Sequence, residues 1–207
     1  GPNPSYRTQP QMLTTADEAL TAVTRAHAAR LALFDNDIAT AKARLDEAQT
    51  DFLTAEKSFN DLTIGDTEQP EDAAKYLPFD MSMSLTEEFT PTQEQSDVVK
   101  KASGMIRSGS SDDAVELLRA ADVEVDVTAA LLPVADVTTQ LEKAQDFVDQ
   151  GLYYEANLAL KQIEDSVIVR TFSIDAIPEQ GQTVQASADA PAQTPPAASP
   201  SAQTATN

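Results

Sequence analysis

The sequence predicts a mainly α-helical protein, built from three antiparallel helical hairpins packed together, with a small β-sheet of two or three short strands. Three observations predict this fold class. Apolar residues recur at the spacing of amphipathic helices through most of residues 14–175. Glycine or asparagine separates helical stretches at three places. Three short segments have instead the alternating or β-branched pattern of strands.

The first hairpin is expected from about residue 15 to 62. Thr15, with Glu18 three residues later, matches a capping box that opens a helix running to about Phe34. The next helix has the clearest period in the chain, an a/d stripe sustained for more than three heptads, which indicates a partner helix along its length. The stripe consists of Ile38, Ala41, Leu45, Ala48, Phe52, Ala55, Phe59 and Leu62.

Four further helices complete the other two hairpins. A third helix starts at Thr90-Pro91 and ends near the glycine at position 109. Ser111-Asp112-Asp113 caps a fourth, and the two acids in its first turn suit the positive end of the helix dipole. Asp136 can cap a fifth helix, which ends at the glycine at position 151. The sixth covers about Tyr153–Asp165.

Three segments read as extended: Tyr76–Ser84, Val123–Thr128 and Val167–Ile174. In the second of them valines alternate with polar residues, which is the period of a half-buried strand. Pro78 lacks an amide proton and would confine the first segment to a sheet edge. A small sheet beside the helices follows from this pattern, and extended loops are the alternative.

The hairpins share an internal pattern when Asn36, Gly109 and Gly151 are taken as equivalent turn positions. Asparagine and glycine tolerate the positive φ that ends many helices. Small residues at matching positions on both arms allow two helices to approach closely. These positions are Ala29, Ala102 and Ala144 seven residues before each turn, Ala41, Ala114 and Ala156 five residues after, and Leu45, Leu118 and Leu160 nine residues after.

The chain is strongly acidic, with 34 acidic and 14 basic residues and a formal net charge of −20. Such a surface repels phosphate backbones, so we expect no nucleic-acid partner. No apolar run approaches the about 20 residues of a membrane-spanning helix, so we expect no membrane insertion. The charge can serve solubility alone. Because it collapses near the sequence pI of about 4.1, acid could also change the association state.

The sequence lacks most of the side chains that covalent catalysis uses. The chain has no cysteine and one histidine, which excludes a catalytic triad, a Cys–His pair and zinc–thiolate sites. We therefore expect no enzyme, no catalytic residues, no cofactor and no metal. His27 lies on or beside an apolar stripe of Leu20, Val23, Leu31 and Phe34, and we expect it partly buried and hydrogen-bonded. Because imidazole titrates near neutral pH, His27 is also a candidate pH sensor.

Two local motifs are candidates for binding sites. Asp35-Asn36-Asp37 resembles the start of a calcium loop, but Ala39 and Thr40 stand where a ligand and a glycine are required, so a helix–turn–helix cap explains it better. Tyr154 and Asn157 share one face of the sixth helix, where a ring and an amide could bind a peptide or planar ligand. Local packing of the hairpin is the alternative for this pair.

Both ends of the chain have a different composition. Residues 1–13 contain three prolines and are expected to be a flexible arm. Residues 176–207 are rich in Pro, Ala, Ser and Thr and are expected to be a disordered tail, which leaves residues 14–175 as the helical domain. The opening Gly1-Pro2-Asn3-Pro4 reads as an expression scar or a processed terminus.

Several stretches together resemble the YfdX family over roughly residues 15–170. They are Ala29-Arg30-Leu31-Ala32-Leu33, Asp46-Glu47-Ala48, Tyr76-Leu77-Pro78, Glu88-Phe89-Thr90-Pro91-Thr92 and the run from Gly151 to Lys161, the most specific of them. The resemblance implies a bacterial, helical, oligomer-forming protein that is exported to the periplasm after removal of a signal peptide. It also implies an association with acid and envelope stress. It supplies no catalytic residues to carry over.

These observations favour a non-enzymatic periplasmic stress-response binding protein, chaperone-like at acid pH, which forms a homo-oligomer. Its partners would be other proteins or a small molecule. The alternatives are a small-molecule-binding protein and a constitutive helical-hairpin scaffold with one dedicated protein partner.

Overall fold

The computed structural model describes residues 12–181, which contain six helices and three strands. The predicted fold class, mainly helical with a small sheet, is confirmed. In chain order the elements are α1 (Asp17–Phe34), α2 (Ile38–Phe59), β1 (Tyr76–Leu85), α3 (Gln93–Arg107), α4 (Ser111–Ala120), β2 (Val125–Pro133), α5 (Val134–Asp149), α6 (Tyr153–Asp165) and β3 (Ile168–Ser173).

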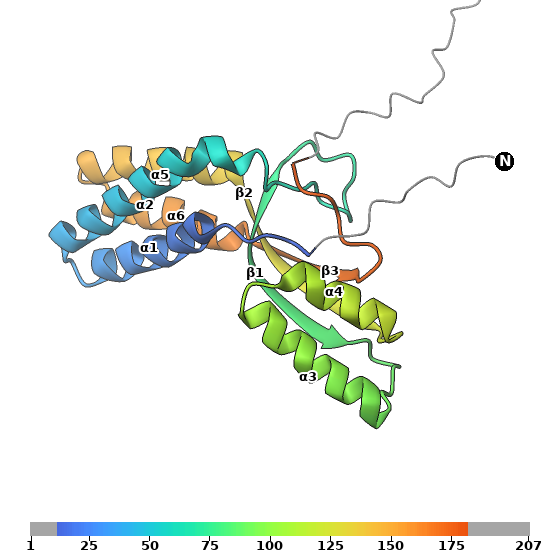
Figure 1. Ribbon diagram of the computed structural model, residues 1–207. Helices are drawn as coiled ribbons and strands as arrows, with labels where there is room; N and C mark the ends of the chain where they lie inside the picture. Colours follow the sequence, from blue (N-terminus) through green and yellow to red (C-terminus); the bar gives the residue numbers. More distant parts are fainter. Residues whose placement is uncertain (1–11, 182–207) are drawn as a thin grey trace, which may run out of the picture.

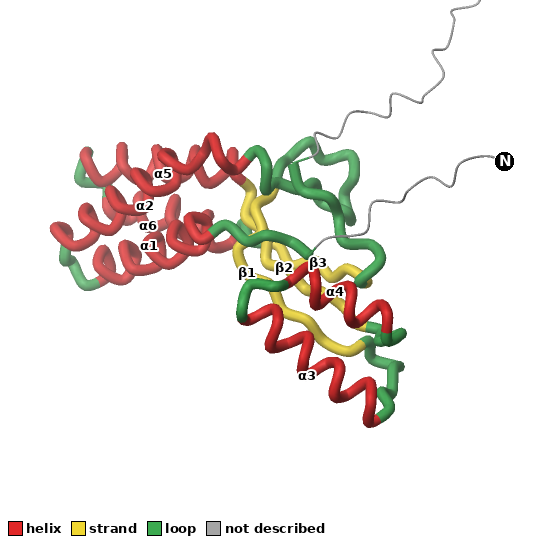
Figure 2. Tube along the Cα trace, in the orientation of Figure 1, coloured by secondary structure: helices red, strands yellow, loops and turns green. Residues whose placement is uncertain are grey.

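The helices form the three predicted hairpins, α1–α2, α3–α4 and α5–α6. The first and third hairpins pack on each other as a four-helix bundle, because α1 contacts α6 and α2 contacts α5. The α3–α4 hairpin packs on the sheet instead, away from the bundle (Figure 1). The sheet lies between these two helical groups, as Figure 2 shows.

The sheet is antiparallel with strand order β1-β2-β3. β1 is an edge strand, as the proline at position 78 predicts, and the register shifts between Pro78 and Asp80. β2 is longer than the predicted Val123–Thr128 and runs to Pro133, where α5 begins without a loop. Alanine and leucine fill the second half of β2, so its strand character comes from pairing on both sides rather than from local propensity.

Several helix starts differ from the sequence-based prediction. The N-cap of α1 is Ala16 and no side chain caps it, so the predicted capping box at Thr15 is wrong. The backbone amide of Ala16 donates instead to the carbonyl of Pro78 at 2.8 Å. Helix α3 begins at Gln93, after the predicted start at Thr90-Pro91, and Thr92 and Gln95 form a capping box there. Asp136 lies in the first turn of α5 and does not cap it, since the N-cap is Pro133.

The predicted cap of α4 also moves. Its N-cap is Ser110, without a side-chain cap bond, and Ser111 is the first helical residue. Asp112 and Asp113 lie in the first turn, as predicted, where negative side chains stabilise the helix dipole.

The three predicted turn residues all adopt positive φ, with values of 58° at Asn36, 87° at Gly109 and 75° at Gly151. In each turn the next amide donates to a carbonyl five residues earlier, for example from Asp37 to Ala32 at 2.8 Å, which is the Schellman pattern. All six alanines at the matching positions of the hairpin arms are buried. The repeated turn geometry inferred from the sequence is therefore confirmed.

Residues 12–181 form two hydrophobic cores. The first fills the bundle and includes the α2 stripe residues Leu45 and Phe52 with Leu132 of β2. The second lies between the sheet and the α3–α4 hairpin and includes Leu118 of α4 and Leu131 of β2. Neighbouring residues of the same strand thus belong to different cores, as the alternation of side chains along a strand requires.

The folded region extends beyond the predicted domain of residues 14–175 in both directions along the chain. Met12 and Leu13 are buried in the second core, and so is Ile177. At the other end the amide of Gly181 donates to the carbonyl of Thr63 at 2.9 Å. The rest of the predicted arm and tail, residues 1–11 and 182–207, lies outside the described residues. None of the helices in residues 12–181 is long and apolar enough to cross a bilayer.

Candidate functional site

Helix α1 turns its smallest apolar residues to the core. Ala19, Ala22, Ala26 and Ala29 are fully buried or nearly so, because α2 and α6 approach α1 closely on two sides. Larger side chains do not fit in so narrow a space, and the stripe that contains Leu20, Leu31 and Phe34 faces outward. An exposed face with large apolar side chains is unusual on a highly charged protein and marks a candidate binding surface.

Helix α6 runs antiparallel beside α1 and adds Tyr154 and Leu158 to the same outward surface. Phe34 is 85% exposed and Tyr154 is 73% exposed. We define the α1–α6 face as the outward surface of this helix pair. Its members are Leu20, His27, Leu31, Phe34, Tyr154, Leu158 and Lys161.

A polar cluster joins the two helices at the centre of this face. The Nδ1 atom of His27 lies 2.7 Å from Oε1 of Glu164, and the other carboxylate oxygen of Glu164 accepts from the guanidinium of Arg30. Nε of Arg30 donates to Oδ1 of Asn157 at 2.9 Å. The amide nitrogen of Asn157 in turn donates to the Arg30 carbonyl oxygen at 3.5 Å. The cluster therefore fixes the pairing of α1 with α6.

The structure places all three candidate residues on or beside this face. His27 is hydrogen-bonded as expected, but its side chain is 59% exposed, more than the partial burial predicted. Asn157 is half-buried and its amide is engaged by Arg30, so only Tyr154 of that pair presents a free polar group. Arg30 and Glu164 were missed, since nothing in the sequence indicates that α1 and α6 are neighbours.

Two ion pairs lie at the α1–α6 face. Arg30 pairs with Glu164, and Lys161 pairs with Asp165 one turn further along α6. Each pair is neutral, so these four groups add no net charge to the face, while the chain as a whole carries −20.

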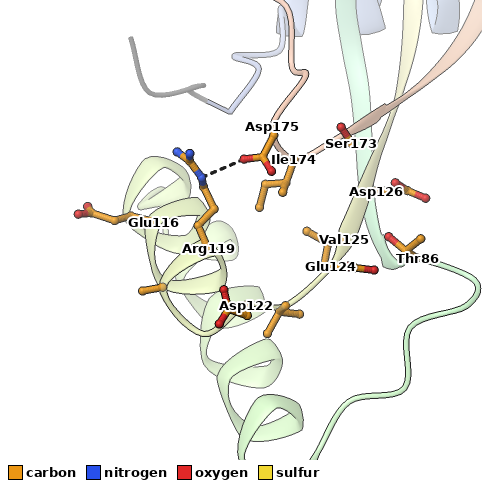
Figure 3. Close-up of a pocket in the computed structure, with 12 residues that line it drawn as sticks. Thr86, Glu116, Arg119, Asp122, Glu124, Val125, Asp126, Ser173, Ile174 and Asp175 are labelled. Atoms are coloured by element: carbon orange, nitrogen blue, oxygen red, sulfur yellow. Dashed lines mark ion pairs between the residues drawn. The ribbon is translucent and has the colours of Figure 1, made fainter. Parts of the chain in front are cut away.

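A second candidate lies at the far end of the sheet, where β3 ends and α4 meets β2. It is a cavity of about 810 Å³ (Figure 3). Its lining combines apolar groups such as Val123 and Ile174 with five carboxylates, those of Glu116, Asp122, Glu124, Asp126 and Asp175. The guanidinium of Arg119 is the single cation in the lining and pairs with Asp175 at 3.1 Å. We call this hollow the acidic pocket.

One ion pair is buried rather than exposed. Arg170 of β3 binds Asp66 through two nitrogens, at 2.7 and 2.8 Å, and Asp66 is only 3% exposed. The hydrogen bond from Arg170 holds the pKa of the Asp66 carboxyl below its usual value. Both charges are satisfied by each other, so this pair ties the segment between α2 and β1 to the sheet and leaves no free group for chemistry.

The possible calcium motif proves to be a turn. Oδ1 of Asp37 accepts from the amide of Thr40 at 3.1 Å as the N-cap of α2. Hydrogen bonding from the side chain of Thr40, and then from its amide, lowers the pKa of Asp37. Asn36 has the positive φ of the Schellman turn. Within residues 12–181, no group of three or more His, Cys, Asp or Glu side chains is arranged to hold a metal ion.

Known proteins resemble this chain in sequence and in fold. The model of the YfdX protein family matches residues 22–173. Protein YfdX of Escherichia coli K12 is 31% identical over 161 residues, which cover 74% of this chain and 73% of that protein. A crystal structure of YfdX from Salmonella Typhi has a TM-score of 0.61 and 23% identity, over 78% of this chain and 96% of that one.

Proposed function

The chain belongs to the YfdX family, and we propose that it is a non-enzymatic periplasmic binding protein that protects other proteins under stress, chaperone-like at acid pH. The observation that carries this proposal is the α1–α6 face. It exposes large apolar side chains on two adjacent helices, beside two neutral ion pairs. Partly unfolded proteins expose apolar side chains of the same kind.

The size of the exposed groups makes such binding energetically reasonable. Burying one large apolar side chain contributes about 1.5–3 kcal/mol. Phe34, Leu31 and Tyr154 together would therefore offset much of the about 4–15 kcal/mol that association costs. A client held this way is bound weakly enough to be released.

Self-association would regulate this surface. We propose that copies of the chain cover their α1–α6 faces at neutral pH, where an uncovered apolar surface promotes aggregation. The net charge of −20 falls toward zero as the pH approaches the sequence pI of about 4.1. Such a change in charge would alter the contacts between copies and uncover the apolar groups.

The test measures molecular mass by light scattering from pH 7 to pH 4, together with suppression of aggregation of an acid-labile client. We expect the wild-type mass to change with pH and client aggregation to fall. The double variant Leu31→Ser, Phe34→Ser should lose client protection. Leu53→Ser is the matched control, because Leu53 is an exposed leucine on α2, outside the face. Equal protection by wild type and the double variant would refute the role of this face.

Small-molecule binding is the second candidate, and a groove between α5 and α6 favours it. The groove holds about 450 Å³ between α5 and α6 and is lined by Phe147, Glu155 and Leu158 among others. A volume of this order suits a small ligand. A ligand bound there should raise the melting temperature of the wild type and not of Leu158→Ala, because Leu158 lines the groove. If the protein is a constitutive scaffold, a pull-down at neutral pH should instead recover one protein partner in stoichiometric amount.

A further inference from the structure

The free edge of β3 presents unpaired backbone amides. β2 is the central strand of the sheet. The backbone amide and carbonyl of each β2 residue point to one neighbouring strand, and those of the next residue point to the other. The amide of Thr86 donates to the carbonyl of Glu124, and the amide of Ile174 donates to that of Val125. Even-numbered residues of β2 therefore pair with β1 and odd-numbered ones with β3.

This alternation fixes which groups of β3 point outward. Residues 168, 170 and 172 pair with β2, so the amides of Val169, Thr171 and Ser173 face away from the sheet. Among the described residues no hydrogen-bond partner is found for these three amides. All three residues are exposed, and Val169 is 56% exposed.

The edge also lacks the usual protection against pairing. Proteins commonly place lysine, proline or a bulge on an exposed edge strand. β3 has none of these, and its one charged side chain, Arg170, is held by Asp66. Two of its outward carbonyls are bonded locally, that of Val169 by Arg170 and that of Ser173 by the amide of Ala176, so the outward amides are the groups left for pairing. The strand is composed largely of β-branched and aromatic residues, which favour pairing.

The acidic pocket lies where this edge ends. Ser173 closes β3 and also lines the pocket, next to Asp126 of β2 and Asp175 just beyond the strand (Figure 3). Of its five carboxylates only that of Asp175 forms an ion pair with another described residue. A strand added to β3 would therefore extend into a hollow with an excess of negative charge and apolar groups at its base.

We propose that the β3 edge binds an extended, basic segment of another polypeptide by β-strand addition, with a lysine or arginine side chain seated in the acidic pocket. The outward amides supply backbone hydrogen bonds, and the carboxylates select the positive side chain. A second copy of this chain fits less well, because its charge of −20 would bring acid against acid. This site is separate from the α1–α6 face, so either proposal can fail alone.

The test uses fluorescence anisotropy with a labelled peptide of alternating valine, threonine and lysine. One control peptide carries glutamate in place of every lysine, and another carries N-methyl groups on alternate amides, which blocks strand pairing. The protein variants are Thr171→Pro, which removes one outward amide without touching the β2 ladder, and the matched Thr171→Val, which keeps it. The charge variant is Glu124→Gln with Asp126→Asn, and Glu142→Gln on α5 is its control.

We expect the lysine peptide to bind about tenfold more weakly to Thr171→Pro than to Thr171→Val, because a lost backbone hydrogen bond is of this size. The charge variant should weaken binding and reduce its salt dependence, while Glu142→Gln should not. If the N-methylated peptide binds as tightly as the unmodified lysine peptide, strand addition is refuted. This comparison uses the wild-type protein, so it remains valid even if Thr171→Pro fails to fold. Equal binding of the glutamate peptide would overturn the role of the pocket. A change in protein mass in Thr171→Pro without any peptide binding would assign the edge to a second copy and overturn the proposal.

Discussion

Replacing Asp66 by asparagine tests the buried ion pair and its response to acid. Asp66→Asn keeps the size of the side chain and removes the charge that faces Arg170. Breaking a buried pair costs about 3–5 kcal/mol, because the remaining charge stays buried without its partner. We expect about 3 kcal/mol here, since Glu68 lies 3.4 Å from Arg170 and retains part of the attraction. The melting temperature at pH 7 should fall by about 10 °C.

The cost of this substitution should depend on pH in a defined direction. The pKa of Asp66 is lowered in the folded protein by its hydrogen bond to Arg170. Its contribution to stability is therefore fully present above the unfolded value of about 3.9 and is lost as the pH falls through the folded value. The difference between wild type and Asp66→Asn should thus be constant from pH 7 to pH 5 and shrink below pH 4.

Urea unfolding at pH 7, 5, 4 and 3 measures this difference. The control is Glu68→Gln, whose carboxylate is largely exposed and should contribute less than about 1 kcal/mol at any pH. If the two substitutions cost the same at pH 7, the pair is not the buried contact described here. If the cost of Asp66→Asn is unchanged at pH 3, the lowered pKa of Asp66 is refuted.

Four further substitutions test the fold. Gly151→Ala should cost about 1–2 kcal/mol in thermal unfolding, because alanine is strained at a φ of 75°. Gly104→Ala, inside α3 with open space at its Cβ position, should instead stabilise by about 0.5–1 kcal/mol, and the same sign at both sites would contradict the turn geometry. Phe52→Ala should cost about 3–5 kcal/mol in urea unfolding, and a loss below about 1 kcal/mol would contradict its place in the bundle core. Arg30→Met should cost about 1 kcal/mol and shift the NMR signals of His27, and unchanged signals would show that Glu164 does not join them.

Local signals in the sequence are sufficient to predict the hairpins. Asn36, Gly109 and Gly151 tolerate positive φ, and each follows a helical stretch, so the turn depends on only a few neighbouring residues. The α2 stripe could be predicted for a similar reason, since its large apolar residues have one face to bury. Pro78 marked an edge strand because it lacks a donor.

The buried face of α1 could not be predicted in the same way. This helix has two apolar faces, one of alanines and one with Leu20, Leu31 and Phe34, and larger residues normally indicate the core. The alanines are buried because two helices approach α1 closely, which is a property of the bundle. The contact between His27 and Glu164, and the lining of the acidic pocket, likewise depend on elements far apart in the sequence.

One strand takes part in both hydrophobic cores. Leu131 and Leu132 of β2 are consecutive, yet one is buried against the α3–α4 hairpin and the other within the bundle. Separating the two cores would expose one of these leucines and break the β2 ladder at the point where α5 begins. The helices form two separate groups, the bundle and the α3–α4 hairpin. Even so, both groups should unfold in a single cooperative transition, with equal calorimetric and van't Hoff enthalpies.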